Sequence, residues 1–386
     1  MRRNACRTAW VVLALACLAT GRAGAAGGTD HRQVRADAWE WDLPAGFPAP
    51  HVPPDNPLSV EKIELGRYLF FDKRLSGNAT QSCATCHRPE LAFTDGVAHA
   101  VGSTGEPHPR SAMSLANVGY NSTLTWQDPT LTRLEDQALV PMFNTHPVEL
   151  GVAGNQDEIL ARLRADVAYP AMFKAAFPGN PEPITIENIA LAIATFERTL
   201  ISGNAPYFRW VYGDDGEALG LAARRGMALF FSERTKCSTC HVGFTFSGPI
   251  RARGIEEIEP AFHNTGLYNV DELGGYPPES PGAIEKTGLE EHRGAFRAPT
   301  LLNIELTAPY MHDGSIASLP EVIDFYAAGG RGRGRTNPNK SERIAGFELA
   351  PGEKEDLIAF LKSLTDREFV DDPRFLSPFD GETTGH

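Results

Sequence analysis

The sequence of 386 residues contains only six cysteines, and it lacks both a long hydrophobic run and an excess of basic side chains. The apolar run at residues 10–19 is too short to cross a bilayer as a helix, and no later segment resembles a membrane span. The formal net charge of −13 argues against nucleic acid and against an anionic lipid surface as partners. No stretch alternates clearly between apolar and polar residues as a half-buried strand does, so we expect a mostly α fold.

Four of the six cysteines lie in two copies of the pattern Cys-x-x-Cys-His, at residues 83–87 and 237–241. This pattern is the attachment signature of c-type haem, in which both thiols bond to the porphyrin and the histidine is the proximal iron ligand. A single copy could arise by chance or serve as a redox dithiol, but two copies that each follow a similar helix are poorly explained by chance. A zinc site needs two further thiols or imidazoles at close spacing, and neither copy has them. The sequence predicts two covalently bound c-type haems, held by Cys83, Cys86, His87, Cys237, Cys240 and His241.

Residues 1–25 have the pattern of a secretory signal peptide, with basic residues, an apolar run and an A-x-A site that ends at Ala25. The two remaining cysteines, Cys6 and Cys17, lie within it, so cleavage leaves no cysteine outside the haem motifs. A lipid anchor on Cys17 is the alternative, but the residues before it fit that signal poorly. Because c-type haem is attached outside the bacterial cytoplasm, we expect a periplasmic protein.

We expect the rest of the chain to form an arm and two domains. The arm, residues 26–57, is rich in proline and glycine and is expected to lie extended on the surface. An N-terminal cytochrome c-like domain follows over 58–203 and a C-terminal one over 204–386, with turn-forming residues at the boundary. The predicted fold is mostly α, with two cytochrome c-like haem domains in tandem and long irregular loops. Apolar spacing predicts helices over 60–71, 157–177, 186–201, 319–328 and 351–364.

An internal repeat accompanies the two haem motifs. Residues 66–71 read Gly-Arg-Tyr-Leu-Phe-Phe and residues 226–231 read Gly-Met-Ala-Leu-Phe-Phe. In cytochrome c folds a glycine at this point lets the first helix cross the last helix closely, because no side chain separates the two backbones. We therefore expect two such helix crossings, one in each domain.

Several longer motifs resemble the bacterial dihaem cytochrome c peroxidases and their MauG-like relatives. The motifs are Trp126, Leu134–Gln137, Pro147–Glu149, Phe296–Asn303 and Leu306–Gly314. With the haem motifs, the resemblance covers nearly all of residues 57–370. It implies a haem-dependent oxidoreductase of the peroxidase type, whose first haem reacts with hydrogen peroxide.

The sixth ligand of the second haem separates two branches of this family. Fourteen residues after His312, where the peroxidases have methionine and the MauG-like enzymes have tyrosine, this chain has Tyr326. Tyrosinate is a hard ligand that favours ferric and higher-valent iron, whereas methionine favours ferrous iron. The resemblance therefore implies that His241 and Tyr326 ligate the second iron, with Met311 as the competing ligand.

Residues 105–115 and 124–126 resemble a narrower group, the MbnH-like enzymes associated with methanobactin gene clusters. These enzymes use peroxide to convert a tryptophan of a partner protein, MbnP, to kynurenine. The resemblance implies a high-valent, bis-ferryl-level dihaem state that oxidises an MbnP-like exported protein by long-range electron transfer. The alternative is a peroxidase that reduces hydrogen peroxide with electrons from a small cytochrome c or cupredoxin. A pure electron carrier is a third possibility, and it would need both irons six-coordinate and inert.

The resemblance also assigns residues around the first haem. Glu149 matches the distal carboxylate of the family, which can move the peroxide proton between oxygens, although two extra residues precede it here. Gln137 and Pro141 keep the family spacing and are expected to line the same pocket. His146 is either an additional base there or a surface histidine.

A histidine blocks the peroxide site of resting peroxidases, and it comes from the loop that holds His99 and His108 here. Neither residue lies at an obvious register with that ligand. Each is therefore either a haem ligand at rest or a solvated loop residue.

Trp126 matches a tryptophan that lies between the two haems in the family and would divide one long electron jump into two short ones. Core packing is the simpler interpretation of the same residue. MauG also has a tryptophan two residues before its second haem motif, where this chain has Thr235. The electron path to a protein substrate must then use another residue, with Trp210 preferred over Trp39 and Trp41.

A calcium ion usually lies between the two domains of this family. Thr307 and Pro309 match the residues that supply backbone carbonyls, which suit this hard cation. The asparagine ligand of the family aligns with Ser111, and this departure predicts weaker binding or binding through water.

Overall fold

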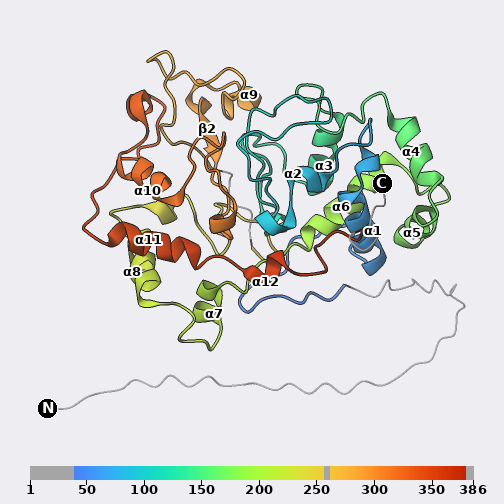
Figure 1. Cartoon of the computed structure of the whole chain (residues 1–386), viewed down its shortest axis with the longest axis horizontal. Coiled ribbons are helices and arrows are strands. Elements are labelled where there is room, and N and C mark those ends of the chain that lie inside the picture. The colour runs from blue at the N-terminus through green and yellow to red at the C-terminus, as the bar shows by residue number, and fades with distance from the viewer. Residues whose placement is uncertain (1–38, 256–260, 380–386) are drawn as a thin grey trace, which may run out of the picture. The chain divides into compact units, whose positions relative to one another are not determined.

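The computed structural model describes residues 39–255 and 261–379, and these form a mostly helical structure with long irregular connections (Figure 1). The predicted signal peptide, with Cys6 and Cys17, lies outside the described residues, as do residues 26–38 of the predicted arm. In the part that the structure describes, no helix is long and apolar enough to cross a membrane.

The described α-helices are mostly short. They are α1 (Val60–Phe71), α2 (Cys83–Cys86), α3 (Leu134–Phe143), α4 (Gln156–Arg164), α5 (Tyr169–Ala176), α6 (Ile186–Arg198), α7 (Pro206–Tyr212), α8 (Leu221–Phe230), α9 (Ile284–Thr287), α10 (Leu319–Ala327), α11 (Glu353–Lys362) and α12 (Arg367–Val370). The 3₁₀ segments are η1 (Lys73–Leu75), η2 (Pro89–Leu91), η3 (Val118–Tyr120), η4 (Cys237–Thr239), η5 (Glu290–His292), η6 (Ile304–Leu306) and η7 (Gly332–Thr336). Two strands, β1 (Phe262–Asn264) and β2 (Ala295–Arg297), pair antiparallel with His263 opposite Phe296.

The N-terminal core forms where α1 crosses α6. The hydroxyl of Ser59 accepts a hydrogen bond from the backbone N–H of Lys62 and so fixes the start of α1. At the crossing, a Cβ atom on Gly66 would overlap the backbone carbonyl of Ala192 in α6. Only glycine allows the two backbones to approach this closely, as the sequence predicted.

The C-terminal core repeats this arrangement with α8 and α11, which Figure 1 shows packed together. A Cβ atom on Gly226 would overlap the carbonyl oxygen of Asp356 in α11. Phe230 and Phe360 fill the space beside the crossing, with ring centroids 5.1 Å apart. Burial of each such ring contributes roughly 1.5–3 kcal/mol to stability. The second predicted crossing is therefore also confirmed.

Other sequence predictions of helices need correction. The helix expected over 157–177 is two helices, α4 and α5, with Pro170 in the first turn of α5, because proline lacks the N–H that an unbroken helix would use there. The helix expected over 186–201 ends at Arg198. The sequence analysis also missed α3 and α7. The helices expected over 60–71, 319–328 and 351–364 are confirmed as α1, α10 and α11, the last two with slightly shorter bounds.

The described part of the arm is extended and most of its residues are exposed or half-buried, but it is anchored by a buried ring. Phe47 is buried in the C-terminal core, with its ring centroid 5.0 Å from that of Phe208 and 4.6 Å from that of Phe244. In the opposite direction, Phe369 and Phe375 near the C-terminus are buried in the N-terminal core. Each core is therefore completed by a segment from the far end of the chain.

A buried polar cluster, Asn117, Ser202, Asn303 and Asp366, joins the two halves. Asn117 Oδ1 accepts from the backbone N–H of Ser202 at 3.1 Å, and Asn303 Oδ1 accepts from that of Asp366 at 2.8 Å. The Ser202 hydroxyl accepts from Asn303 Nδ2 at 3.0 Å and donates to Asp366 Oδ2 at 3.3 Å. The segment predicted as a boundary is therefore a buried joint, and the domain limits at 203 and 204 remain a prediction.

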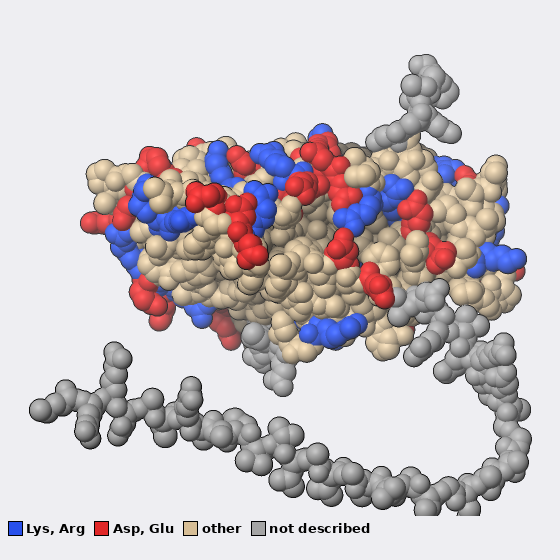
Figure 2. All heavy atoms as spheres, turned by 90° about the horizontal axis from the view of Figure 1, so that it is seen from below, with Lys and Arg blue, Asp and Glu red and all other residues tan. Residues whose placement is uncertain are grey.

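The surface charges are mixed on the face seen in Figure 2. Acidic and basic side chains are interspersed there, with uncharged surface between them. The net negative charge of the chain is therefore not gathered into a single field on that face.

Candidate active site

Backbone carbonyls orient the histidine of each haem motif. Nδ1 of His87 donates to the carbonyl of Phe93 at 2.9 Å, and Nδ1 of His241 donates to that of Phe246 at 3.0 Å. Because a carbonyl can only accept, Nδ1 carries the proton and Nε2 is left as a potential iron ligand. Burial lowers the pKa of both histidines, so both are neutral, the form that binds a metal. Phe93 and Phe246 both have positive φ, 63° and 50°, so the same unusual turn is built twice.

The four thiols of the motifs lie in apolar surroundings. Burial raises the pKa of Cys83 and Cys237, and it raises the pKa of Cys86 to about 12. None of these four cysteines forms a disulfide. A redox dithiol or a zinc site requires accessible thiolate, which these surroundings disfavour. The environment is that expected for thioether attachment to an apolar porphyrin edge.

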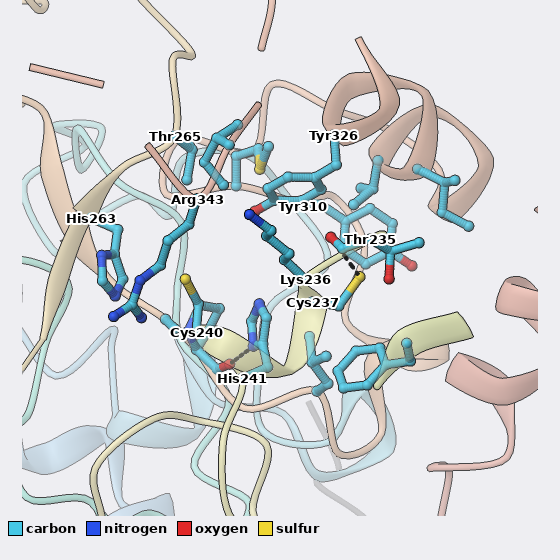
Figure 3. A pocket seen from close by; sticks show the side chains of 18 of the residues that line it. Thr235, Lys236, Cys237, Cys240, His241, His263, Thr265, Tyr310, Tyr326 and Arg343 are labelled. Carbon is cyan, nitrogen blue, oxygen red and sulfur yellow. Dashed lines mark hydrogen bonds between the residues drawn. The ribbon is translucent and has the colours of Figure 1, made fainter. Parts of the chain in front are cut away.

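The C-terminal motif opens on a cavity of about 330 Å³, here called the C-terminal cavity. Tyr326 enters it from α10 on the side opposite His241 (Figure 3). A capping box at Ser318, whose backbone N–H donates to Glu321 at 3.0 Å, fixes the start of α10. Burial and then the nearby thiols raise the pKa of Tyr326. Met311 lines the same cavity, so the structure brings both candidate ligands to this site.

Two buried polar groups test whether haem fits the C-terminal cavity. Arg297 donates to the carbonyl of Thr125 at 3.1 Å and to the sulfur of Met113 at 3.5 Å, but it has no carboxylate partner within residues 39–255 and 261–379. Burial lowers its pKa to about 10. Nε2 of His312 is also buried with no hydrogen-bond partner in the described part. An unpaired buried cation is costly, and the propionates of haem are anions that would pair with it. The residues present therefore fit a haem.

The N-terminal motif opens on a smaller cavity of about 90 Å³, here called the N-terminal cavity. Besides Cys83, Cys86 and His87, its walls include Gln137, Pro141, His108 and Glu149. Burial raises the pKa of Glu149 above its ordinary value of 4.5. Burial and the Arg110 charge lower the pKa of His108 to about 4. Nε2 of His108 lies 4.0 Å from Oε1 of Glu149, so a neutral imidazole faces the carboxyl group in the cavity.

The three histidines proposed for this site do not meet there. His99 is exposed, and its Nδ1 lies 2.9 Å from the carbonyl of His108. His146 is also exposed and does not line the N-terminal cavity. Among the three, His108 alone lines the cavity, because the loop folds back over Glu149.

The sequence analysis missed a second carboxyl group in the N-terminal cavity. Glu197 lies near the end of α6 and lines the cavity one helical turn after Ile193. Burial raises its pKa to about 8, and its Oε2 has no hydrogen-bond partner among the described residues. The position of Glu197 four residues after Ile193, on the apolar face of this helix, was the signal that could have identified it.

Trp126 is buried and lines the C-terminal cavity. Its Nε1 donates to the carbonyl of Ser111 at 2.8 Å, and its own carbonyl accepts from the backbone N–H of Arg297 at 2.8 Å. The structure places Thr235 at the same cavity, whereas Trp210 is on α7 and lines neither cavity. Trp39 and Trp41 pack against each other, with centroids 5.9 Å apart.

The predicted calcium site is not tested by the side-chain arrangement. No group of three or more His, Cys, Asp or Glu residues that could hold a metal is found within the described ranges. The site predicted at Thr307, Pro309 and Ser111 would instead use backbone carbonyls. The carbonyl of Ser111 accepts a hydrogen bond from Trp126, and the calcium site remains a prediction.

Comparisons with known proteins agree with this geometry. A family model described as di-haem cytochrome c peroxidase matches residues 60–216. The methylamine utilization protein MauG of Methylorubrum extorquens is 38% identical over 335 residues, covering 85% of this chain and 87% of that protein. The cytochrome c551 peroxidase of Pseudomonas aeruginosa is 30% identical over 331 residues, covering 85% of each chain. The crystal structure of a MauG-like protein associated with microbial copper homeostasis superposes with a TM-score of 0.85 and 47% identity, covering 89% of this chain and 100% of that one. This chain therefore belongs to the MauG-like dihaem cytochrome c peroxidase family and is a haem-dependent oxidoreductase.

Proposed function

We infer that this protein uses hydrogen peroxide to oxidise a residue of an exported partner protein, a tryptophan by preference, through long-range electron transfer. The inference is carried by Tyr326, which reaches into the C-terminal cavity opposite His241. A hard phenolate ligand favours high oxidation states of iron, whereas a peroxidase that stores an electron on its second haem needs a softer ligand. The similarity to a MauG-like protein associated with copper homeostasis supports the same choice.

The N-terminal cavity has the groups that peroxide chemistry requires. When bound, the haems supply the redox chemistry, which reduces peroxide to water and retains two oxidising equivalents. Glu149 would accept a proton from one peroxide oxygen and return it to the other, which leaves as water. The raised pKa of Glu149 suits both steps, and the neutral imidazole of His108 lies 4.0 Å from its carboxyl group, beyond direct hydrogen-bond distance.

Conversion of tryptophan to kynurenine fits this supply of oxidising equivalents. Each peroxide removes two electrons, so cleavage of the indole C2–C3 bond to N-formylkynurenine consumes two peroxides and releases two waters. One further water then releases the formyl carbon as formate and leaves kynurenine. A folded partner cannot enter a cavity of about 90 Å³, so its electrons must reach the haems from the surface.

The test uses the dihaem holoenzyme, hydrogen peroxide and candidate exported proteins that contain tryptophan. We expect mass spectrometry to find kynurenine in one of them only when enzyme and peroxide are both present. A parallel steady-state assay supplies reduced small cytochrome c as the electron donor. Rapid peroxide turnover with the cytochrome, and no oxidised residue in any partner, would contradict the proposal.

The second candidate is a peroxidase with a small cytochrome c or cupredoxin as donor. It is favoured by relatives named cytochrome c551 peroxidase, at 30% identity over 85% of the chain. The cytochrome assay separates the two, since the favoured function predicts little turnover in it.

A further inference from the structure

An aromatic cluster leads from the wall of the C-terminal cavity to the protein surface. The ring centroid of His312 lies 6.5 Å from Trp126, 6.4 Å from Tyr268 and 6.3 Å from Tyr276. The two tyrosine rings are 5.5 Å apart. Trp126 and Tyr276 are buried, whereas Tyr268 is half-buried, and the guanidinium of Arg331 lies 5.3 Å from its ring centroid. Short ring-to-ring steps therefore connect the cavity wall with solvent.

Tyr268 has the proton acceptor that oxidation of a phenol requires. Its hydroxyl donates to Oδ2 of Asp313 at 2.5 Å. Burial and this hydrogen bond raise the pKa of Tyr268. Asp313 therefore presents a side-chain carboxylate directly to the phenol hydroxyl, and this base can take the proton without either group moving.

Two other tyrosines serve as comparisons. Tyr276 lies in the cluster but has no carboxylate partner among the described residues, and Tyr169 has a carboxylate partner but lies outside the cluster. Tyr276 belongs to the cluster, but its hydroxyl donates at 2.9 Å to the amide oxygen of Asn264, which is a poor proton acceptor. Tyr169 donates to the carboxylate of Asp72 at 2.7 Å, but it lies in the N-terminal core. Among the described residues, the only aromatic ring recorded against Tyr169 is that of Phe173. Tyr268 alone among these three combines a carboxylate partner with a place in the cluster.

We propose that Tyr268 is the exit relay through which the partner protein is oxidised, an inference that rests on the proposed function. Tyr268 gives one electron inward across His312 toward Trp126 and gives its proton to Asp313. A neutral tyrosyl radical and a protonated Asp313 remain. An electron from the partner residue and the proton from Asp313 then restore Tyr268. The oxidant is the pair of equivalents retained from hydrogen peroxide, and one electron crosses the protein in each cycle. Tyr268 thus provides the electron exit, a role that Thr235 cannot fill because its side chain has no aromatic ring to oxidise.

The experiment mixes the dihaem holoenzyme, labelled with ring-deuterated tyrosine, with one equivalent of hydrogen peroxide. Rapid-freeze electron paramagnetic resonance then detects radicals while haem absorbance follows the oxidised state. We expect a tyrosyl signal in the wild type that disappears in Tyr268→Phe, with unchanged haem content and unchanged initial reaction with peroxide. Asp313→Asn keeps an acceptor oxygen but loses the base, so its radical should form about a hundredfold more slowly, at the low end for a positioned proton acceptor.

Two matched variants serve as controls. Tyr276→Phe removes a hydroxyl from the cluster without removing a carboxylate partner, and Tyr169→Phe removes a tyrosine–aspartate hydrogen bond away from it, so both should keep the signal. The proposal is overturned if the wild type gives no tyrosyl signal, if the signal survives in Tyr268→Phe, or if it is lost in Tyr169→Phe. No change in wild-type haem absorbance on adding peroxide would instead contradict the proposed function, and with it the relay, which would have no source of oxidising equivalents.

Discussion

At the scale of single residues, Tyr326 decides which branch of chemistry the C-terminal cavity supports. The substitution Tyr326→Met should raise the reduction potential of the second haem by on the order of 0.1 V or more, within the roughly 0.8 V range that axial ligands span. A soft thioether stabilises ferrous iron, whereas phenolate stabilises ferric iron. Potentiometric titration followed by absorbance measures the shift.

Tyr310→Phe is the matched control for that measurement. Tyr310 lines the same cavity, but its hydroxyl donates to the carbonyl of Ile304 at 3.0 Å, so its loss should leave the potential nearly unchanged. Equal potentials in the wild type and in Tyr326→Met would mean that Tyr326 does not ligate the iron. Met311 would then be the ligand to test.

Glu149 should control the reaction with peroxide. The variant Glu149→Gln keeps the shape of the side chain but cannot take a proton, so the rate constant should fall by about 10²–10³-fold. Because burial raises the pKa of Glu149, and only its carboxylate form accepts a proton, the wild-type rate should increase as pH rises through that raised pKa. Stopped-flow absorbance across pH measures both effects.

Glu106→Gln is the control, since Glu106 is exposed on the neighbouring loop and accepts from the backbone N–H of Val148 at 3.0 Å. It should leave the rate and its pH dependence unchanged. If Glu149→Gln keeps the pH dependence of the wild type, another group is the base, and Glu197 in the same cavity is the first to examine.

The sequence could predict the attachment residues because their chemistry is local to five consecutive positions. It also predicted that Glu149, Gln137 and Pro141 share one cavity, and the structure places them there, although their roles remain predictions. It could not choose between His99 and His108, because the answer depends on how one loop folds over another. The role of Arg297 could not be predicted for a similar reason, because the lack of a carboxylate partner is known only once all of its neighbours in the fold are known.

At the scale of elements, the two helix crossings depend on a missing side chain. Gly226→Ala should destabilise the C-terminal core by about 1–3 kcal/mol, because the added methyl group would force α8 away from α11. The thermal unfolding midpoint should fall, and hydrogen exchange should quicken in α8 and α11 but not in α1 and α6.

Gly216→Ala is the control, since Gly216 is exposed outside the helices and a Cβ atom there would meet nothing within 4 Å. Its stability should stay within about 0.5 kcal/mol of the wild type, as for most surface changes. A Gly226→Ala protein as stable as the control would show that the helices can separate at little cost.

The elements that sequence reasoning found are those with a regular apolar pattern. α1, α6 and α10 each carry apolar residues at helical spacing and begin after a Ser or Thr N-cap. β1 and β2 have only three residues each, too few for an alternating pattern to stand out. The break between α4 and α5 was missed because apolar residues continue across it, and only Pro170 marked the interruption.

At the scale of the whole molecule, the stability of the N-terminal core should depend on residues from the C-terminal end of the chain, which pack within it. Phe369→Ala should cost about 3–5 kcal/mol, because its ring is buried 5.7 Å from that of Phe93 in the N-terminal core. The carbonyl of Phe93 holds His87, so the optical spectrum of the first haem should change more than that of the second.

Phe379 provides the comparison, since it is 38% exposed and its ring meets only that of Tyr68 in α1, edge-on at 5.4 Å, among the described rings, so Phe379→Ala should cost about 1 kcal/mol, less than Phe369→Ala. Hydrogen exchange in α1 and α6 distinguishes the two variants. Equal protection in both would show that the N-terminal core does not need the C-terminal segment.

The same exchange bears on the order in which the protein is made. Phe369 and Phe375 leave the ribosome more than 280 residues after Cys83 and Cys86, yet they complete the core beside those cysteines. Until the last part of the chain is synthesised, the first half cannot close over its own haem motif. We therefore expect Cys83 and Cys86 to stay accessible for haem attachment until the C-terminal segment is present and packs on the N-terminal core, which then encloses the first haem site.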